Sequence, residues 1–356
     1  MMIIHRISLL CCRYVIRDSA GLSGWSPSAP QSGCRLSWWG SQASSPFLVA
    51  AGPSARRHHL KSLTSQASRV PKQNNDNDSN NNYHRQNKHQ GAHTANHIRP
   101  NTMSEPKVII VTGGSKGIGL AVVQDLLEAK HNVIMVARTP IGVSELVKDY
   151  PSQIKFLAAD MTVPDTAHRA VELAHLSYGK LDGVVVNHGV LTPITRLAEA
   201  SIEDWKNHYD VNVFSALSIV KEAIPHLRAT KGKIIFVSSG AAIKAYAAWG
   251  AYGSSKAALN SICRHVAVEE PDITAVAVSP GRVDTDMQRE LREKGQGVMS
   301  DNDYAGFVSA FEEGQLNKPE WPAQVIAKLS LDAKSDLSGK YVAWNGPEVA
   351  EYREQH

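Results

Sequence analysis

Tyr252 and Lys256 are the two side chains of this sequence whose types and spacing point most directly to chemistry. They stand four residues apart in a stretch with helical periodicity, which places the phenol and the ammonium on one face, one turn apart. A free phenol has a pKa of about 10, too high for easy proton exchange near neutral pH. We expect the neighbouring cation to stabilise the phenolate. Tyr252 can then donate a proton to a carbonyl oxygen during reduction, or accept it in the reverse direction.

Two serines follow the predicted strand Lys233–Val237. A hydroxyl at the carboxyl end of a parallel strand opens into the crevice where α/β sheets bind ligands. Ser238 or Ser239 can therefore hold a substrate oxygen, although serines at this place also cap the segment that follows. Taken alone, Tyr252 and Lys256 are more often exposed residues of a helix face, so the assignment needs the surrounding pattern.

A glycine-rich turn, Thr112–Gly119, follows the first predicted strand and opens a helix. Glycine lets the turn close tightly and lets the backbone approach a phosphate, which the free amides and positive dipole end of the helix attract. In this strand–turn–helix context the motif predicts a dinucleotide site. The residues expected to contact the cofactor here are Gly113, Ser115, Lys116, Gly117, Ile118 and Gly119.

The end of the second predicted strand favours NADP over NAD. An NAD site needs a carboxylate there for the ribose 2′-hydroxyl, whereas this chain has Arg138. Arg138 can pair with a 2′-phosphate, and Lys116 adds a second positive charge. The alternative is a solvated loop arginine. Asp160 follows the third strand and can hydrogen-bond the adenine edge, or serve as a plain turn aspartate.

Continuous apolar runs predict strands that are buried on both faces, as in a parallel sheet covered by helices. Because strands and helices alternate, we expect an α/β fold, a Rossmann-type doubly wound parallel sheet in a single domain with right-handed crossovers. The clearest predicted helices are Ile202–Leu227 and Ala251–Val268. The predicted strands are Lys107–Thr112, Asn132–Ala137, Ile154–Ala158, Gly183–Val186, Lys233–Val237 and Ile273–Val278.

Residues 1–102 differ in composition from the rest: they carry 12 Lys and Arg against 3 Asp and Glu, whereas residues 103–356 carry 26 against 31. Ser19–Asn75 has no acidic residue and repeats Arg, Ser and Ala, as mitochondrial transit segments do. Asn74–Thr102 is a polar tract with too few aliphatic residues to offset the entropy of folding. We predict a disordered or targeting leader over 1–102 and one domain over 103–356, with Met103 as the expected working start.

The same composition limits the classes of partner and the cell compartment that we expect for this protein. The mildly acidic domain argues against nucleic-acid binding, and no apolar run has the length of a membrane span. Cys263 is the single cysteine of residues 103–356, which suits a reducing compartment. We therefore expect a cytoplasmic protein, or a mitochondrial one if the leader is a transit segment. The His-rich stretch His84–His97 is interpreted as a solvated tract, and no metal site is predicted.

Over Lys107–Asn345 the chain resembles the short-chain dehydrogenase/reductase family. Thr112–Gly119 matches its glycine motif, and Tyr252 with Lys256 matches its Tyr-x-x-x-Lys motif. The family's catalytic serine lies thirteen residues before the tyrosine, which implies Ser239. Asn212 matches the asparagine that helps to hold a water near the lysine for a proton relay. The resemblance thus implies four catalytic residues: Asn212, Ser239, Tyr252 and Lys256.

The resemblance also implies cofactor contacts outside the glycine turn. One departure stands after the fourth strand, where the family usually has Asn-Asn-Ala-Gly and this chain has Val186-Asn187-His188-Gly189. We expect His188 to be a structural histidine, although it can also face the nicotinamide. The implied cofactor contacts here are Asn187, Tyr252, Lys256, Pro280, Gly281, Val283 and Thr285.

Within the family, Glu269–Asp272 and Asp284–Gln288 resemble sepiapterin reductase and the fungal benzil reductases. The aspartate that anchors a pterin falls at about Ala343 here, so a diketone or another hydrophobic carbonyl fits better. Trp249 is expected to line an apolar substrate pocket, or to belong to the core. Asp286–Leu316 is expected to form a helical flap in which Phe307 and Phe311 share an apolar face, either toward the substrate or in the core.

These observations predict reduction of a ketone or α-dicarbonyl by hydride from NADPH. Tyr252 is the acid, Ser239 orients the carbonyl, Lys256 tunes the tyrosine and binds ribose, and Asn212 supports the relay. Two alternatives remain: the same fold acting on a pterin, sugar or steroid carbonyl, and a non-enzymatic NADPH-binding sensor. The resemblance further implies a homo-oligomer through the two long predicted helices, a dimer before a tetramer, with a monomer as the alternative.

Overall fold

The computed structural model describes residues 105–140 and 142–354. The predicted leader and its His-rich stretch lie outside the described residues. The division of the chain at residue 103 therefore stays a prediction.

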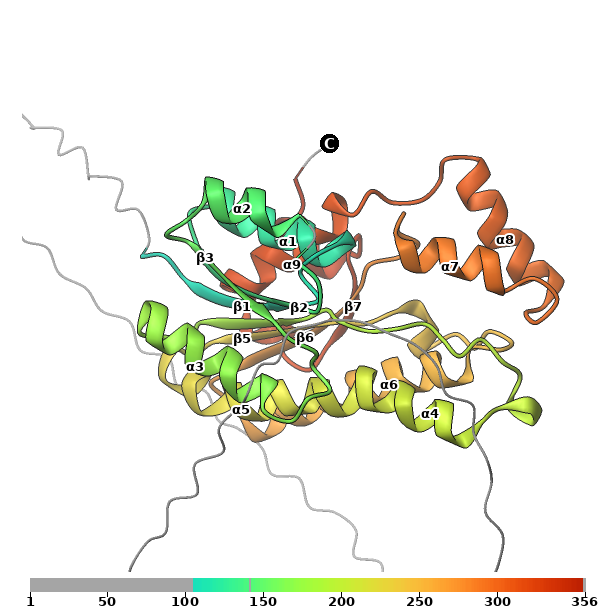
Figure 1. The fold of residues 1–356 in the computed structure, drawn as a ribbon, viewed down its shortest axis with the longest axis horizontal. Helices are drawn as coiled ribbons and strands as arrows, with labels where there is room; N and C mark the ends of the chain where they lie inside the picture. The colour runs from blue at the N-terminus through green and yellow to red at the C-terminus, as the bar shows by residue number, and fades with distance from the viewer. Residues whose placement is uncertain (1–104, 141, 355–356) are drawn as a thin grey trace, which may run out of the picture. The chain divides into compact units, whose positions relative to one another are not determined.

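A seven-stranded parallel sheet forms the centre of the described chain (Figure 1), in the order β3-β2-β1-β4-β5-β6-β7. This confirms the predicted Rossmann-type parallel sheet. Two predicted strands shift by one residue, since β1 begins at Val108 and β6 covers Thr274–Ser279. The strands are β1 Val108–Thr112, β2 Asn132–Ala137, β3 Ile154–Ala158, β4 Gly183–Val186, β5 Lys233–Val237, β6 Thr274–Ser279 and β7 Tyr341–Ala343.

Helices cover both faces of the sheet (Figure 1). Because side chains alternate along a strand, Ile109 and Val111 of β1 belong to one core, whereas Val108 and Ile110 belong to the other. The first core packs under α1 (Gly117–Glu128), α2 (Val143–Asp149) and α9 (Glu320–Asp332). The second packs under α3 (Thr166–Tyr178), α5 (Ser215–Thr230) and α6 (Gly250–Glu269). Short 3-10 turns span Leu197–Glu199, Gly240–Ala242, Ser335–Leu337 and Pro347–Tyr352.

The prediction of one continuous helix over Ile202–Leu227 is wrong in one respect. The segment is divided into α4 (Ile202–Tyr209) and α5 by a π-helical turn, Asp210–Phe214. From within this turn, the Asn212 side chain bonds the backbone of Val190. Such π turns inside helices are frequent at functional sites.

The predicted flap is helical. It consists of α7 (Asp286–Lys294) and α8 (Asp301–Glu312), which lie together beyond one end of the sheet (Figure 1). Phe307 is buried in a third apolar cluster with Trp249 and Tyr252. Phe311 is 47% exposed, and the Arg292 guanidinium lies 3.7 Å from its ring centre. The expectation of one shared apolar face is therefore wrong for Phe311, because Arg292 covers that ring instead.

Within residues 105–140 and 142–354, none of the helices combines the length and the apolar character that crossing a membrane requires. The same residues contain no group of three or more His, Cys, Asp or Glu side chains arranged to hold a metal ion.

Candidate active site

The glycine turn between β1 and α1 has the shape of a phosphate cradle. Gly113 and Gly117 adopt φ values of +65° and +54°, which side chains rarely tolerate. A Cβ on Gly119 would lie 2.4 Å from both the Asn187 amide nitrogen and the Gly113 carbonyl oxygen. In the described chain α1 has no side-chain cap, so its first amides stay free for an anion. This geometry fits a dinucleotide.

Asn187 fastens the end of β4 to this turn. Its Nδ2 donates to the carbonyl oxygens of Thr112 and Gly113, both at 3.0 Å, and its backbone N–H donates to the Thr112 hydroxyl. Thr112 is fully buried, and the sequence analysis gave it no separate role. In the sequence, this role of Thr112 was indicated by its position as the last residue of β1, directly before the glycines.

His188 bridges two elements of the scaffold. Its Nδ1 lies 2.7 Å from the Thr112 hydroxyl, and its Nε2 lies 2.7 Å from the Ser215 hydroxyl at the start of α5. Burial is the main cause that lowers the pKa of His188 to about 4, so the ring is neutral at pH 7. Both ring nitrogens are occupied, which agrees with the predicted structural role.

The two cations expected at a 2′-phosphate face acidic side chains. Arg138 lies 3.9 Å from Asp160, and Lys116 lies 2.9 Å from Asp286 at the start of α7. Hydrogen bonds from the backbone and side chain of Thr162 hold the pKa of Asp160 below its usual range, and Arg138 adds to this. All four charged side chains are at least 41% exposed, which leaves the cations free to change partner.

Tyr252 and Lys256 lie on the first turns of α6 and are both buried. The Lys256 Nζ donates to the Val237 carbonyl at the end of β5, at 2.8 Å, and lies 5.8 Å from the centre of the Tyr252 ring. Burial lowers the pKa of Lys256 to about 8. The spacing of four residues therefore brings phenol and ammonium to one face, as predicted from the sequence.

The expected direction of the tyrosine pKa is wrong. Burial raises the pKa of Tyr252, and a hydrogen bond with the Ser239 side chain only opposes that rise. The physical reason is that removal from water penalises the phenolate, while the Lys256 ammonium is bonded to a carbonyl on β5. Tyr252 is thus held in its protonated form, which is the form that a proton donor needs.

The two serines after β5 have different surroundings. The Ser238 hydroxyl is buried and donates to the Asn260 side chain at 2.7 Å. Ser239 is half-buried, bonds with Tyr252 and accepts from the Ala241 amide at 3.1 Å. Ser239 is therefore the serine beside the tyrosine.

Asn212 fixes the loop after β4. Its Oδ1 accepts from the Val190 amide at 2.8 Å, and its Nδ2 donates to the Val190 carbonyl at 2.9 Å. A Cβ on Gly189 would lie 3.2 Å from the Asn212 Oδ1 and 3.6 Å from the Lys256 Nζ. The asparagine side chain and the lysine ammonium therefore approach each other across Gly189.

His208 is a site residue that the sequence analysis missed. Its Nδ1 lies 2.7 Å from the Thr192 carbonyl, which can only accept, so Nδ1 carries the proton. The bare Nε2 then accepts from the Asn212 amide at 2.9 Å. His208 is 2% exposed. In the sequence, the contact between His208 and Asn212 was indicated only by their spacing of four residues.

Replacing His208 with Leu is expected to lower the free energy of unfolding by about 1–3 kcal/mol, because the Thr192 carbonyl and one Asn212 donor lose a buried partner. Urea denaturation followed by circular dichroism measures the change. His265→Leu, at a side chain that is 74% exposed, is the matched control and should change little. Equal stability of the His208 variant and the wild type would contradict this role.

The segment after β6 lies over the glycine turn. Pro280 accepts from the Asn317 side chain at 3.1 Å, and Gly281 adopts a φ of +75°. Thr285 lies against the turn, since a Cβ on Gly117 would come within 3.2 Å of its Cγ2. Val283 is buried and forms an isolated bridge with Asn317. This is the placement expected of a segment that closes over a cofactor.

Ile118 and Ser115, both expected to contact the cofactor, have different surroundings. The Ile118 side chain packs against the core beneath α1 and α9. Ser115 is half-exposed on the turn itself. Ile118 can therefore offer a bound cofactor its backbone rather than its side chain.

Trp249 lies at the centre of an aromatic cluster above Tyr252. Its ring centre is 5.6 Å from that of Tyr252 in an edge-on arrangement, 5.2 Å from Phe307 of the flap and 4.9 Å from Tyr246. Trp249 is thus buried between Tyr252 and the flap residue Phe307, which agrees with the core role, and its role in lining a substrate pocket stays a prediction.

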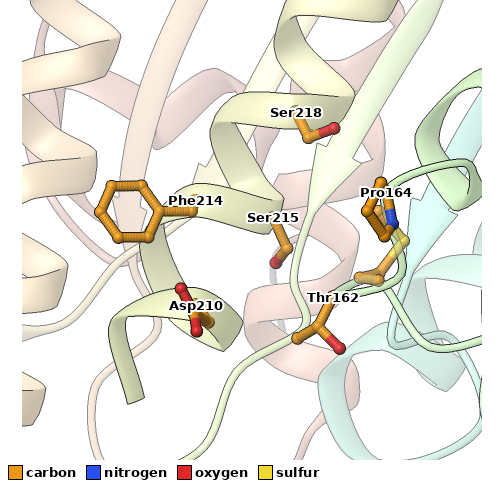
Figure 2. A pocket seen from close by; sticks show the side chains of 7 residues that line it. Thr162, Pro164, Asp210, Phe214, Ser215 and Ser218 are labelled. Atoms are coloured by element: carbon orange, nitrogen blue, oxygen red, sulfur yellow. The ribbon is translucent and has the colours of Figure 1, made fainter. Parts of the chain in front are cut away.

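A pocket of about 480 Å³ lies on another part of the surface, between the loop after β3 and the start of α5 (Figure 2). Ser215, which contacts His188, forms part of its wall. The four predicted catalytic side chains, all in the described chain, are not among its lining residues. These are Met161, Thr162, Pro164, Asp210, Phe214, Ser215 and Ser218.

A family model described as short chain dehydrogenase matches residues 107–296. An uncharacterized oxidoreductase of Schizosaccharomyces pombe is 42% identical over 241 residues, which cover 67% of this chain and 96% of the relative. A benzil reductase of Saccharomyces cerevisiae that forms (S)-benzoin is 38% identical over 252 residues, with 67% and 96% covered. A crystal structure of a Saccharomyces cerevisiae short chain dehydrogenase/reductase is similar with a TM-score of 0.68 and 39% identity, and 70% of this chain and 100% of that one are covered. The chain therefore belongs to the short chain dehydrogenase family of oxidoreductases.

Proposed function

We propose that this oxidoreductase reduces a hydrophobic ketone or α-dicarbonyl with NADPH. The observation that carries the proposal is the convergence of Ser239, Tyr252 and Lys256 at the carboxyl end of β5. When bound, NADPH supplies the hydride, with its electron pair, to the carbonyl carbon and leaves as NADP⁺. The carbonyl oxygen takes a proton, so the product is an alcohol.

The chain's own groups bind and protonate the substrate. The Ser239 and Tyr252 hydroxyls donate to the carbonyl oxygen and so fix which carbon faces the cofactor. Tyr252 then transfers its phenolic proton to that oxygen as negative charge develops there. Lys256 stabilises the resulting phenolate and binds the ribose hydroxyls. Asn212 holds the loop through which solvent returns the proton.

The substrate class follows from the surroundings of Tyr252. Trp249, Tyr246 and Phe307 give the site an aromatic wall, which suits an aromatic or bulky aliphatic ketone. The position of a pterin-anchoring aspartate is occupied by Ala343, and the neighbouring Trp344 stacks on Trp321. The 38% identical relative named as a benzil reductase supports an α-dicarbonyl.

The first experiment is a substrate panel with purified protein, in which NADPH oxidation is followed by absorbance. We expect turnover of aromatic 1,2-diketones, slower turnover of simple ketones, and no turnover of sepiapterin. The proposal fails if a pterin, sugar or steroid carbonyl is the preferred substrate, or if NADPH binds without turnover across the whole panel.

The preference for NADP is proposed from Arg138 and Lys116, both exposed beside the cradle. Replacing Arg138 with Glu is expected to raise KM for NADPH about tenfold to hundredfold, because a charge-assisted bond of about 1.5–3 kcal/mol is lost. KM for NADH should change far less. Steady-state kinetics with both cofactors measures this, and Arg169→Glu on the exposed face of α3 is the control. An equal rise for NADPH and NADH would contradict the assignment.

We also propose a dimer through α5 and α6 and a cytoplasmic location. Phe214, directly before α5, and Leu217, one turn further on, are 57% and 45% exposed, which supports an apolar interface there. Light scattering on the purified protein tests the oligomeric state. Amino-terminal sequencing of the native protein tests the location, since a start at Met103 favours the cytoplasm over the mitochondrion.

A further inference from the structure

An ion pair joins the glycine turn to the start of the flap. The Lys116 Nζ donates to the Asp286 Oδ2 at 2.9 Å, and Asp286 is the first residue of α7. Beside this pair, a Cβ on Gly117 would come within 3.2 Å of the Thr285 Cγ2. Two neighbouring contacts, one charged and one apolar, therefore hold the start of the flap against the turn.

Lys116 is also one of the two cations proposed for the 2′-phosphate of NADPH. The glycine turn lies against the end of β2, because the Gly113 and Gly114 amides donate to the Val136 carbonyl at 2.8 and 3.4 Å. Arg138, the other cation, stands two residues beyond Val136. The Lys116 side chain is 71% exposed, so its flexible four-carbon stem can carry the ammonium from one partner to another. One ammonium thus faces two anions, the flap carboxylate and the phosphate.

The two anions compete for this ammonium. The bond with Lys116 is the main cause that holds the pKa of Asp286 below its usual range, so the carboxylate is charged at neutral pH. A phosphate monoester carries about −1.5 to −2 charge at that pH. If both bonded Lys116 at once, like charges would be brought close together around a single positive charge, which is unfavourable. A bound 2′-phosphate and Asp286 therefore exclude each other at Lys116.

Asp286 keeps a partner when it loses Lys116. Its Oδ1 accepts from the Arg289 guanidinium, one turn further along α7, at 2.6 Å. Its side chain is 47% exposed, so water can solvate the Oδ2 that the lysine leaves. An exposed ion pair contributes little to stability, and a phosphate with nearly two charges can displace it. The exchange of partners therefore strands neither charge.

We propose that Asp286 is a specificity-determining residue that couples the flap to the 2′-phosphate of NADPH. The phosphate takes Lys116 from Asp286 and so releases the start of α7 from the glycine turn. NADH has a hydroxyl at that position and leaves the ion pair intact. This inference rests on the proposed function. Leu291 of α7 belongs to the apolar cluster that contains Tyr252, and Met287 packs against it, so the released segment is part of the wall around the reacting tyrosine. NADPH thereby prepares the flap for the carbonyl substrate, and NADH does not.

Cofactor binding tests the competition. Asp286→Asn keeps the size of the side chain and removes its charge. The dissociation constant for NADPH, measured by fluorescence titration without a carbonyl substrate, is expected to fall about 1.5- to 5-fold, the contribution of an exposed ion pair. The constant for NADH should not change. In a Lys116→Gln background, Asp286→Asn should no longer affect NADPH. Asp284→Asn, at an exposed carboxylate two residues earlier, is the matched control and should leave both constants unchanged.

Hydrogen exchange of the α7 peptide, followed by mass spectrometry, tests the release of the flap. In the wild type, the amides of Asp286–Lys294 are expected to exchange about 1.5- to 5-fold faster with saturating NADPH than with saturating NADH, because the same ion pair is lost. In Asp286→Asn both cofactors should give the same rate. Arg289→Gln is the control: it removes the pair within α7 and keeps the bond from Lys116 to Asp286, so it should still distinguish the two cofactors.

An unchanged NADPH constant in Asp286→Asn, an equal gain for NADH, or an equal gain in Asp284→Asn would overturn the inference. Equal exchange of α7 with the two cofactors in the wild type would overturn it as well. Neither readout uses a carbonyl, so failure to reduce the substrate panel would remove the proposed reaction alone. If Lys116→Gln weakens NADPH binding but Asp286→Asn does not tighten it, the inference alone is wrong. If Lys116→Gln leaves NADPH binding unchanged, the NADP assignment of Lys116 and the inference both fail.

Discussion

Replacing Tyr252 with Phe is expected to lower kcat for the preferred carbonyl about 10²- to 10⁴-fold, the usual contribution of a positioned general acid. The ring and its edge-on contact with Trp249 remain, so the apolar site keeps its shape. The change removes the hydroxyl that bonds with Ser239 and supplies the proton. NADPH binding should persist, because the cradle and Lys256 are untouched. Single-turnover kinetics and fluorescence titration with NADPH measure the two quantities.

Tyr178→Phe is the matched control for this change. The Tyr178 hydroxyl is also buried, and within the described residues it has no hydrogen-bond partner. Its removal should leave kcat unchanged and stability equal or higher. If Tyr252→Phe keeps wild-type turnover, Tyr252 is not the acid. If it loses NADPH binding as well as turnover, its role is structural.

Replacing Lys256 with Met should have a comparably large effect on turnover, and it separates catalysis from stability. Without the ammonium, the phenolate of Tyr252 loses its stabilising charge and the ribose loses a donor, so we expect kcat to fall at least about 10²-fold. KM for NADPH should rise as well. The buried ammonium is also costly to the fold, since burial lowers its pKa from 10.5 to about 8.

The destabilisation that the buried Lys256 ammonium causes can be measured through its dependence on pH. Below pH 8 both folded and unfolded chains carry the charge, and the folded chain is destabilised. Between pH 8 and 10.5 the folded chain releases the proton first, so its stability rises with pH. The wild type should therefore gain about 3 kcal/mol relative to Lys256→Met across this window. Urea denaturation of both proteins at a series of pH values measures the difference, and a constant difference would contradict the buried-charge account.

The sheet was predictable because each strand is a short apolar run that needs burial on both faces. Residues such as Ile109 and Ile110 point to opposite cores, so the strand is covered on both faces. The edge strand β7 was the least evident, since Tyr341–Ala343 is only three residues long. It was not among the six predicted strands.

The local geometry of the site was less accessible from the sequence. Apolar periodicity runs through Asp210–Phe214, so it did not reveal the π turn there or the bond from the Asn212 side chain to a distant loop. His208 acts through the same tertiary contact. The direction of the Tyr252 pKa depends on burial, which spacing alone does not report.

The central claim is that the Tyr252 hydroxyl delivers a proton to the carbonyl whose carbon receives the hydride. A crystal structure of the protein with NADP⁺ and the α-hydroxyketone product tests this most directly. We predict that the Tyr252 and Ser239 oxygens both lie within hydrogen-bond distance of the new alcohol oxygen, with its carbon stacked against the nicotinamide. A phenol turned away from that oxygen, or a product bound elsewhere, would contradict the account.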